Sequence, residues 1–128
     1  MLSHISLPVR DLEVGRRFYA AVLGALGAEQ VWANPRGVAF GVAGRDRFSL
    51  RVAPAGERPA AAAGFHLAFN APRRAAVDAF HAAALAGGGR CDGPPGPRPH
   101  YGPSYYAAFV FDPDGHRLEV VHQEQKAP

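Results

Sequence analysis

Residues 4–23, HISLPVRDLEVGRRFYAAVL, and residues 66–85, HLAFNAPRRAAVDAFHAAAL, align over twenty positions without a gap. Identical residues at matched positions include the two histidines that open these stretches, His4 and His66. Self-similarity at a fixed spacing indicates a repeated supersecondary unit. We therefore expect a fold built from two copies of one unit, with an imidazole at the start of each copy.

The first copy has the pattern of a strand, a helix and three short strands. Residues 2–9 alternate in polarity, as a half-buried strand does, and Asp11 is a suitable N-cap for a helix over 12–26. Apolar runs bounded by turn signals predict the three short strands. These strands are expected at 29–33, 37–43 and 47–53, with turns at 34–37 and 44–46.

The second copy follows a Pro-, Gly- and Ala-rich linker at 54–64. A strand is expected at 65–70 and a helix at 72–86, with Pro72 in the first turn of that helix. The next elements are a Pro- and Gly-rich segment that is mostly loop with room for a short strand, then two strands joined by the turn DPDG. These pieces are expected at 87–104, 105–112 and 116–123, with the turn at 112–115.

The repeated pattern predicts an α+β fold of two tandem βαβββ modules within one domain, 1–128. One face of each sheet is expected to be covered by the helix of its module. The expected boundaries are module 1 at about 1–54, a linker at about 55–63, module 2 at about 64–123 and a short tail at 124–128.

The composition is that of one globular domain with its own core: 128 residues, 48% hydrophobic and 20% charged, with a formal net charge of +3. The arginines are scattered without a basic run, which disfavours a nucleic-acid surface. No apolar stretch reaches the length of a membrane span, and no signal peptide precedes the first strand. The single cysteine suits a reducing compartment. We therefore expect a cytoplasmic protein that binds neither nucleic acid nor membrane.

Strand alternation places His4, His66 and Glu119 on the sheet face that lies away from the helices. That face carries small residues and a few polar ones, which leaves room for a ligand. Each of the three residues, taken singly, is more often a hydrogen-bonded or solvated side chain than a ligand. Their shared facing and repeat placement favour a metal site, because imidazole and carboxylate are donors for divalent transition metals.

Four segments of the chain resemble the vicinal oxygen chelate superfamily. They are SHISLPV at 3–9, DLEVGRRFYAAVLG at 11–24, FHLAF at 65–69 and, most specifically, FVFDPDGHRLEVV at 109–121. The superfamily includes glyoxalase I, extradiol dioxygenases, fosfomycin-resistance thiol transferases, bleomycin-resistance proteins and methylmalonyl-CoA epimerase. The resemblance implies paired βαβββ modules whose curled mixed sheets surround a cleft that holds a divalent metal.

This resemblance implies His4, His66 and Glu119 as ligands of Fe, Mn, Zn or Ni, with lyase, isomerase or dioxygenase chemistry on a small oxygen-rich molecule. Glyoxalase I enzymes normally place a second carboxylate where the internal repeat puts Ser49, so standard glyoxalase chemistry is disfavoured. Two alternatives stay open: a non-catalytic, bleomycin-resistance-like binding protein and a fosfomycin-type thiol transferase. The lysine- and serine-rich loop of the fosfomycin enzymes is absent.

Residues expected to touch the substrate come from the sheet face with room for a ligand and from the segment 98–106. That segment offers anion binding, proton transfer and stacking, although it would also suit packing over the second sheet or at a dimer interface. We expect Glu119, His100 and Tyr101 to take part in catalysis. The expected substrate-binding residues are Ser6, Trp32, Ser49, Arg51, Arg98, Tyr105 and Tyr106. In relatives the first and last strands often come from different subunits, so a homodimer with sites at its interface is expected.

Overall fold

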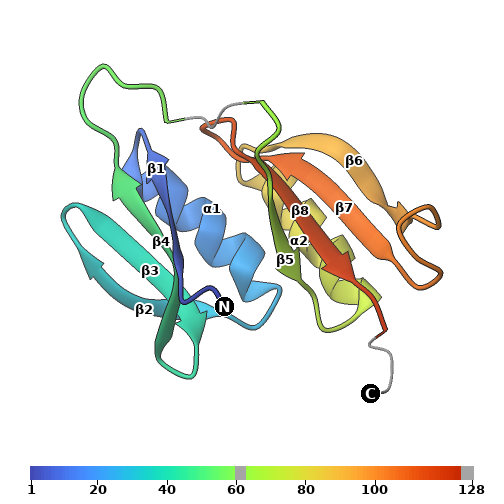
Figure 1. Cartoon of the computed structure of the whole chain (residues 1–128). Helices are drawn as coiled ribbons and strands as arrows, with labels where there is room; N and C mark the ends of the chain where they lie inside the picture. Colours follow the sequence, from blue (N-terminus) through green and yellow to red (C-terminus); the bar gives the residue numbers. More distant parts are fainter. Residues whose placement is uncertain (60–62, 125–128) are drawn as a thin grey trace.

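The structure, a computed structural model, describes residues 1–59 and 63–124. It confirms the α+β class and the repeated plan (Figure 1). Module 1 consists of β1 (Ile5–Val9), α1 (Leu12–Gly24), β2 (Glu29–Asn34), β3 (Gly37–Val42) and β4 (Arg45–Val52). Module 2 consists of β5 (Leu67–Asn70), α2 (Arg74–Ala86), β6 (Arg90–Pro97), β7 (Tyr106–Phe111) and β8 (Arg117–His122).

Each module forms its own four-stranded mixed sheet. The strand orders are β1-β4-β3-β2 and β5-β8-β7-β6. β1 runs parallel to β4 and β5 runs parallel to β8, while the other neighbours are antiparallel. Within the described residues, β1 and β5 therefore each lie at the edge of a sheet with one hydrogen-bonded neighbour.

The first helix begins where the sequence predicts, because Asp11 caps it. The Asp11 side chain accepts hydrogen bonds from the backbone N–H groups of Glu13 and Val14, at 3.0 and 3.1 Å. The second helix begins later than expected: Arg73 is its N-cap in an extended conformation, so Pro72 precedes the helix and does not lie in its first turn.

Three further expectations of local structure need correction. The first and fifth strands begin after their histidines, so His4 and His66 precede the strands that they were expected to enter. The 87–104 segment contains a strand of eight residues, Arg90–Pro97, which tolerates its prolines because it lies at the sheet edge and pairs only with β7. The turn before β4 is formed by Ala43 and Gly44, both at positive φ as a two-residue hairpin requires.

The bulky side chains of both sheets form one core with the two helices. α1 packs against α2, α1 also covers β2, β3 and β4, and α2 covers β6, β7 and β8. The predicted helix-facing strand residues in this core include Leu7, Val9, Val38, Phe40, Phe48, Leu50, Leu118 and Val120. The helices thus lie between the sheets, and the opposite face of each sheet points outward.

The turn between β7 and β8 joins module 2 to module 1. Asp112 is buried and accepts a hydrogen bond from the Tyr19 hydroxyl of α1 at 2.6 Å. The backbone N–H of Arg10 donates to Asp114 at 3.0 Å, and the buried His116 donates from Nε2 to the carbonyl of Pro8 at 2.8 Å. The DPDGH segment therefore fixes the second module to the end of β1.

Neither helix in the described part of the chain has the length and apolar character needed to cross a membrane.

Candidate functional site

The open face of the second sheet contains a polar cavity of about 390 Å³. β8 contributes Glu119 and Arg117 to its wall, β7 contributes Phe109, and His66 borders it just before β5. The pairing of β7 with β8 brings these side chains together. Phe109 lies opposite Glu119 and, two residues along each strand, Phe111 lies opposite Arg117.

Glu119 lines this cavity and contacts two polar neighbours. The side chain of Glu119 is 6% exposed, whereas the side chain of His66 is 51% exposed. His66 Nε2 lies 3.2 Å from Glu119 Oε1, and the Tyr105 hydroxyl donates to Glu119 Oε2. A buried carboxylate with two polar partners can take part in ligand binding without the cost of an unpaired charge.

Tyr105 remains a neutral donor in this cluster. Burial, followed by the hydrogen bond and the negative charge of Glu119, raises the pKa of Tyr105 well above its ordinary value. The hydroxyl proton is therefore retained at neutral pH and points to Glu119 Oε2.

The cavity also holds an ion pair that sequence reasoning missed. Arg117 donates from Nε and Nη2 to Asp92 Oδ2, at 3.2 and 2.9 Å. The strand alternation that selected Glu119 also puts Arg117 on the same face, and this signal could have identified it. Asp92 offered no such signal because β6 was expected to be mostly loop.

The third expected ligand, His4, lies on the other module. It is exposed, and its Nδ1 is 3.0 Å from the hydroxyl of Ser3. Across residues 1–59 and 63–124, no group of three His, Cys, Asp or Glu side chains is arranged to hold a metal ion. The structure therefore joins His66 to Glu119 and leaves His4 apart from them.

The open face of the first sheet carries the other expected contacts from module 1. Ser6 and Ser49 share a hydrogen bond of 2.6 Å, which accounts for a buried serine at the position of Glu119 in the repeat. The indole N–H of Trp32 donates to Asp46 at 2.9 Å, and the guanidinium of Arg51 lies 5.7 Å from the centre of the Trp32 ring.

The aromatic segment at 98–106 divides between three places. Tyr101 lines the polar cavity, and its ring centre lies 4.1 Å from that of His100 with the two rings tilted by 41°. Arg98 donates to the backbone carbonyls of Pro94 and Gly96, which ties the start of the segment to β6. Tyr106 lies on the helix side of the sheet, where its hydroxyl donates to Asp78 at 2.7 Å, so the structure does not bring it to the cavity.

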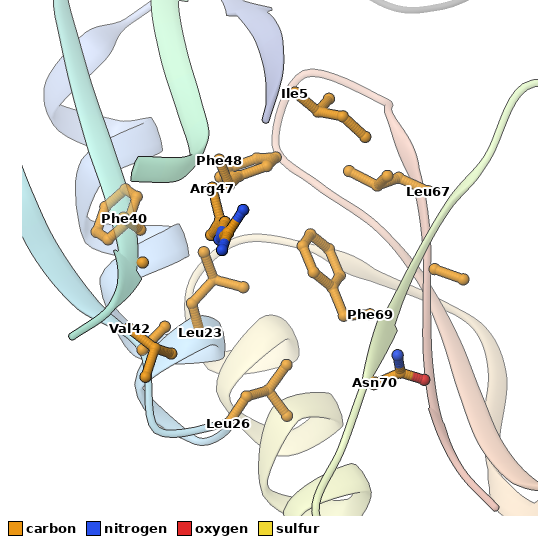
Figure 2. Close-up of a pocket in the computed structure, with 13 residues that line it drawn as sticks. Ile5, Leu23, Leu26, Phe40, Val42, Arg47, Phe48, Leu67, Phe69 and Asn70 are labelled. Carbon is orange, nitrogen blue, oxygen red and sulfur yellow. The ribbon is translucent and has the colours of Figure 1, made fainter. Parts of the chain in front are cut away.

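A second cavity, of about 280 Å³, lies between the modules on their helix-facing sides. Figure 2 shows Phe48 and Arg47 of the first module across from Phe69 of the second. Apart from Arg47 and Asn70 its described lining is apolar or glycine, and it contains no His, Cys, Asp or Glu. The described lining of this cavity therefore lacks the imidazole, thiolate and carboxylate donors that transition-metal sites use.

The fold agrees with the comparison with known proteins. The sequence model of the Glyoxalase/Bleomycin resistance protein/Dioxygenase superfamily matches residues 1–120. The chain belongs to this superfamily. The resemblance to vicinal oxygen chelate proteins is thereby confirmed, and members of the superfamily generally use divalent metals.

Several solved structures of the superfamily are similar to this chain. A glyoxalase/bleomycin resistance protein from Albidiferax ferrireducens T118 is 35% identical, with a TM-score of 0.84 over 97% of this chain and 99% of that one. The fosfomycin resistance protein FosX from Mesorhizobium loti is 25% identical, with a TM-score of 0.68 over 97% and 92% of the two chains. A glyoxalase-related enzyme from Fulvimarina pelagi is 24% identical, with a TM-score of 0.73 over 96% and 88%. None of the curated proteins matches the chain significantly.

For a superfamily member, the donors on the second sheet fit a divalent ion in part. An imidazole nitrogen and a carboxylate oxygen 3.2 Å apart at the wall of a polar cavity are a chemically suitable pair. Protein sites for Zn or non-haem Fe commonly use three such side chains, so one donor is missing from this pair.

Proposed function

We propose that this protein is a metal-dependent enzyme of the lyase, isomerase or dioxygenase type that acts on a small oxygen-rich molecule. The proposed metal ligands are His66 and Glu119 of one chain with His4 of a second copy. The convergence of His66 and Tyr105 on the buried carboxylate of Glu119, at the wall of a polar cavity, is the observation that supports this proposal.

The outward direction of the open sheet faces supports a contribution from a second copy. The helices lie between the two sheets of one chain, so His4 and Glu119 belong to faces that do not meet within it. β1 and β5, the strands that follow His4 and His66, are edge strands in the described part of the chain, and an edge strand can pair with another chain. A symmetric dimer would then contain two equivalent sites.

In the proposed site the divalent ion would act as a Lewis acid on vicinal substrate oxygens. The residues of the chain would do the rest. The hydroxyl of Tyr105 fixes the orientation of the Glu119 carboxylate, and Phe109 forms an apolar part of the cavity wall. Ser49, which bonds Ser6, supplies no second carboxylate, and this favours a three-ligand site over a glyoxalase I site.

Metal titration of protein freed of metal with a chelator tests the proposal. We expect the wild type to bind about one equivalent of Mn²⁺, Fe²⁺, Ni²⁺ or Zn²⁺, and His66→Ala to bind at least about tenfold more weakly while staying folded. His81→Ala is the matched control, because His81 lies on α2 beside Cys91 and outside the cavity. Binding below about a tenth of an equivalent for all four metals would contradict the proposal.

The similarity to FosX favours fosfomycin resistance as a second candidate function. Loss of fosfomycin in the presence of metal-loaded protein, with water or with a thiol, would be followed by NMR. Conversion would support this candidate. Tight binding of fosfomycin or another small molecule without any conversion would instead support a binding protein of the bleomycin-resistance type.

A further inference from the structure

A row of charged and aromatic side chains crosses the second sheet beside Glu119. Arg90 of β6 lies opposite Phe111 of β7, which in turn lies opposite Arg117 of β8. Both guanidinium groups pack on the same ring, at 4.9 Å from its centre for Arg90 and 5.6 Å for Arg117. Arg117 lines the polar cavity, and Arg90 lies across Phe111 from it.

Asp92 is a built-in counter-ion for one of these cations. It contacts Arg117 through a single oxygen, Oδ2, while the Arg117 side chain remains 51% exposed. A guanidinium has five N–H donors in a planar fork, and Asp92 uses two of them. Arg117 lines the cavity, so the remaining donors are available to a ligand that enters it. The cavity also carries two carboxylates, Asp92 and Glu119, and Glu119 already contacts His66 and Tyr105. Arg117 is the one cation of its described lining apart from the imidazole of His66, and Arg90 adds a positive charge on the neighbouring strands.

We propose that Arg117, supported by Arg90, binds an anionic group of the substrate, and that the substrate is a small aromatic acid carrying vicinal oxygens. The placement of those oxygens at Glu119 rests on the proposed function. Arg117 and Glu119 are two residues apart on one strand, which separates their backbone positions by about 7 Å. A carboxylate or phosphonate on one side of an aromatic ring and the chelating oxygens on the other would span this distance.

The walls of the cavity fit a flat ring. Phe109 lies between β6 and β8 in the row next to Phe111, and Tyr101 borders the same cavity with its ring 5.3 Å from that of Tyr105. Aromatic side chains stack on planar ligands, and a guanidinium fork binds a carboxylate or phosphonate through two parallel hydrogen bonds. The two kinds of contact together select aromatic acids over neutral sugars or aliphatic alcohols.

Titrations of the metal-free protein isolate the anion site from the metal site. The full chain in EDTA would be titrated with benzoate, phenylphosphonate and the neutral isostere benzamide, with binding followed by NMR of backbone and arginine Nε–H signals. We expect both anions to bind and benzamide to bind at least about tenfold more weakly. The relative affinities of benzoate and phenylphosphonate then identify the preferred anion.

Three variants test the assignment to Arg117. Arg117→Gln should weaken benzoate about tenfold, and Asp92→Asn should strengthen it, because the competing carboxylate is lost. Arg36→Gln, in the turn between β2 and β3, removes the same charge elsewhere and should leave benzoate binding unchanged. The gain in Asp92→Asn and the preference for benzoate over benzamide do not depend on the folding of Arg117→Gln.

Equal binding of benzoate and benzamide, or unchanged benzoate binding in folded Arg117→Gln, would overturn the inference. These results are separate from the metal titration. Benzoate binding that depends on Arg117 in a protein without metal affinity would leave the anion site standing and contradict the proposed function. Metal binding without discrimination between benzoate and benzamide would support the proposed function and contradict the anion site.

Discussion

The Glu119 carboxylate has a defined orientation because each of its oxygens has a different partner. His66 contacts Oε1 and Tyr105 contacts Oε2. Groups that hydrogen-bond to metal ligands fix ligand geometry and raise metal affinity. Tyr105 is therefore expected to act on the metal through Glu119 as a positioning residue.

Tyr105→Phe tests this role by removing the hydroxyl and keeping the ring. We expect the affinity for Zn²⁺ or Mn²⁺ to fall by about tenfold or more, because the carboxylate becomes free to rotate. Tyr101→Phe is the control, since Tyr101 lines the same cavity and has no hydrogen bond to Glu119 among the described contacts. Isothermal titration calorimetry gives both affinities, and equal values would show that Tyr105 does not position the ligand.

Single residues also show what sequence alone could predict about the site. Alternation placed His4, His66 and Glu119 on the open sheet faces, and the structure brings His66 Nε2 to 3.2 Å from Glu119 Oε1. The same alternation puts Arg117 on that face, yet no role was predicted for it, because facing alone does not distinguish a binding arginine from a solvated one. Tyr106 was chosen for its place in an aromatic segment, yet its register on β7 puts it on the helix side of the sheet.

At the scale of elements, the spacing of hydrophobic residues predicts a helix or strand correctly where these residues recur regularly on one face. The helices and seven of the strands follow alternation or helical spacing closely enough to be recognised. β6 was underestimated because its sequence, RCDGPPGP, has neither strong β propensity nor alternation. It becomes a strand through pairing with β7, which is a tertiary effect that its own residues do not encode.

The β7–β8 turn is the element that holds the modules together, and Tyr19 tests it. Tyr19→Phe removes the 2.6 Å hydrogen bond to Asp112 and leaves a buried carboxylate with one donor fewer. We expect the free energy of unfolding in urea to fall by about 1.5–3 kcal/mol, as for hydrogen bonds to charged groups. Tyr101→Phe, at an exposed tyrosine, should change it by less than about 0.5 kcal/mol. Equal effects of the two substitutions would contradict the role of the Tyr19–Asp112 hydrogen bond in holding the modules together.

The contribution of Tyr19 also has a defined pH dependence. Burial, and then the charge and hydrogen bond of Asp112, raise the pKa of Tyr19 well above its ordinary value. The unfolded chain ionises near the ordinary value of about 10 while the folded chain stays neutral, so this stability is complete below that pH and is lost as pH rises. The wild-type advantage over Tyr19→Phe should therefore shrink from roughly pH 9 to pH 11 in urea titrations. A constant difference would contradict this assignment.

At the scale of the whole molecule, the sequence could not show how the two sheets face each other. Alternation assigns each side chain to one face of its own sheet and says nothing about the placement of that sheet against the next. The apolar helix faces pack together through α1 and α2, which sends the two open faces outward. His4 therefore lies apart from Glu119 within one chain, and its role as a metal ligand stays a prediction.

A mixing experiment separates a shared site from a site within one chain. His4→Ala and His66→Ala would each be purified and freed of metal, and a metal concentration would be chosen at which the wild type is loaded and neither variant alone binds appreciably. They would then be mixed in equal amounts under mild denaturation and refolded so that subunits exchange. In a symmetric dimer with shared sites, each mixed dimer has one intact site and one doubly substituted site. Random exchange makes half of the dimers mixed, so about a quarter of the wild-type metal capacity should return. No recovery in a sample shown by light scattering to have exchanged would contradict the shared site, as would a wild type that is monomeric and binds metal fully.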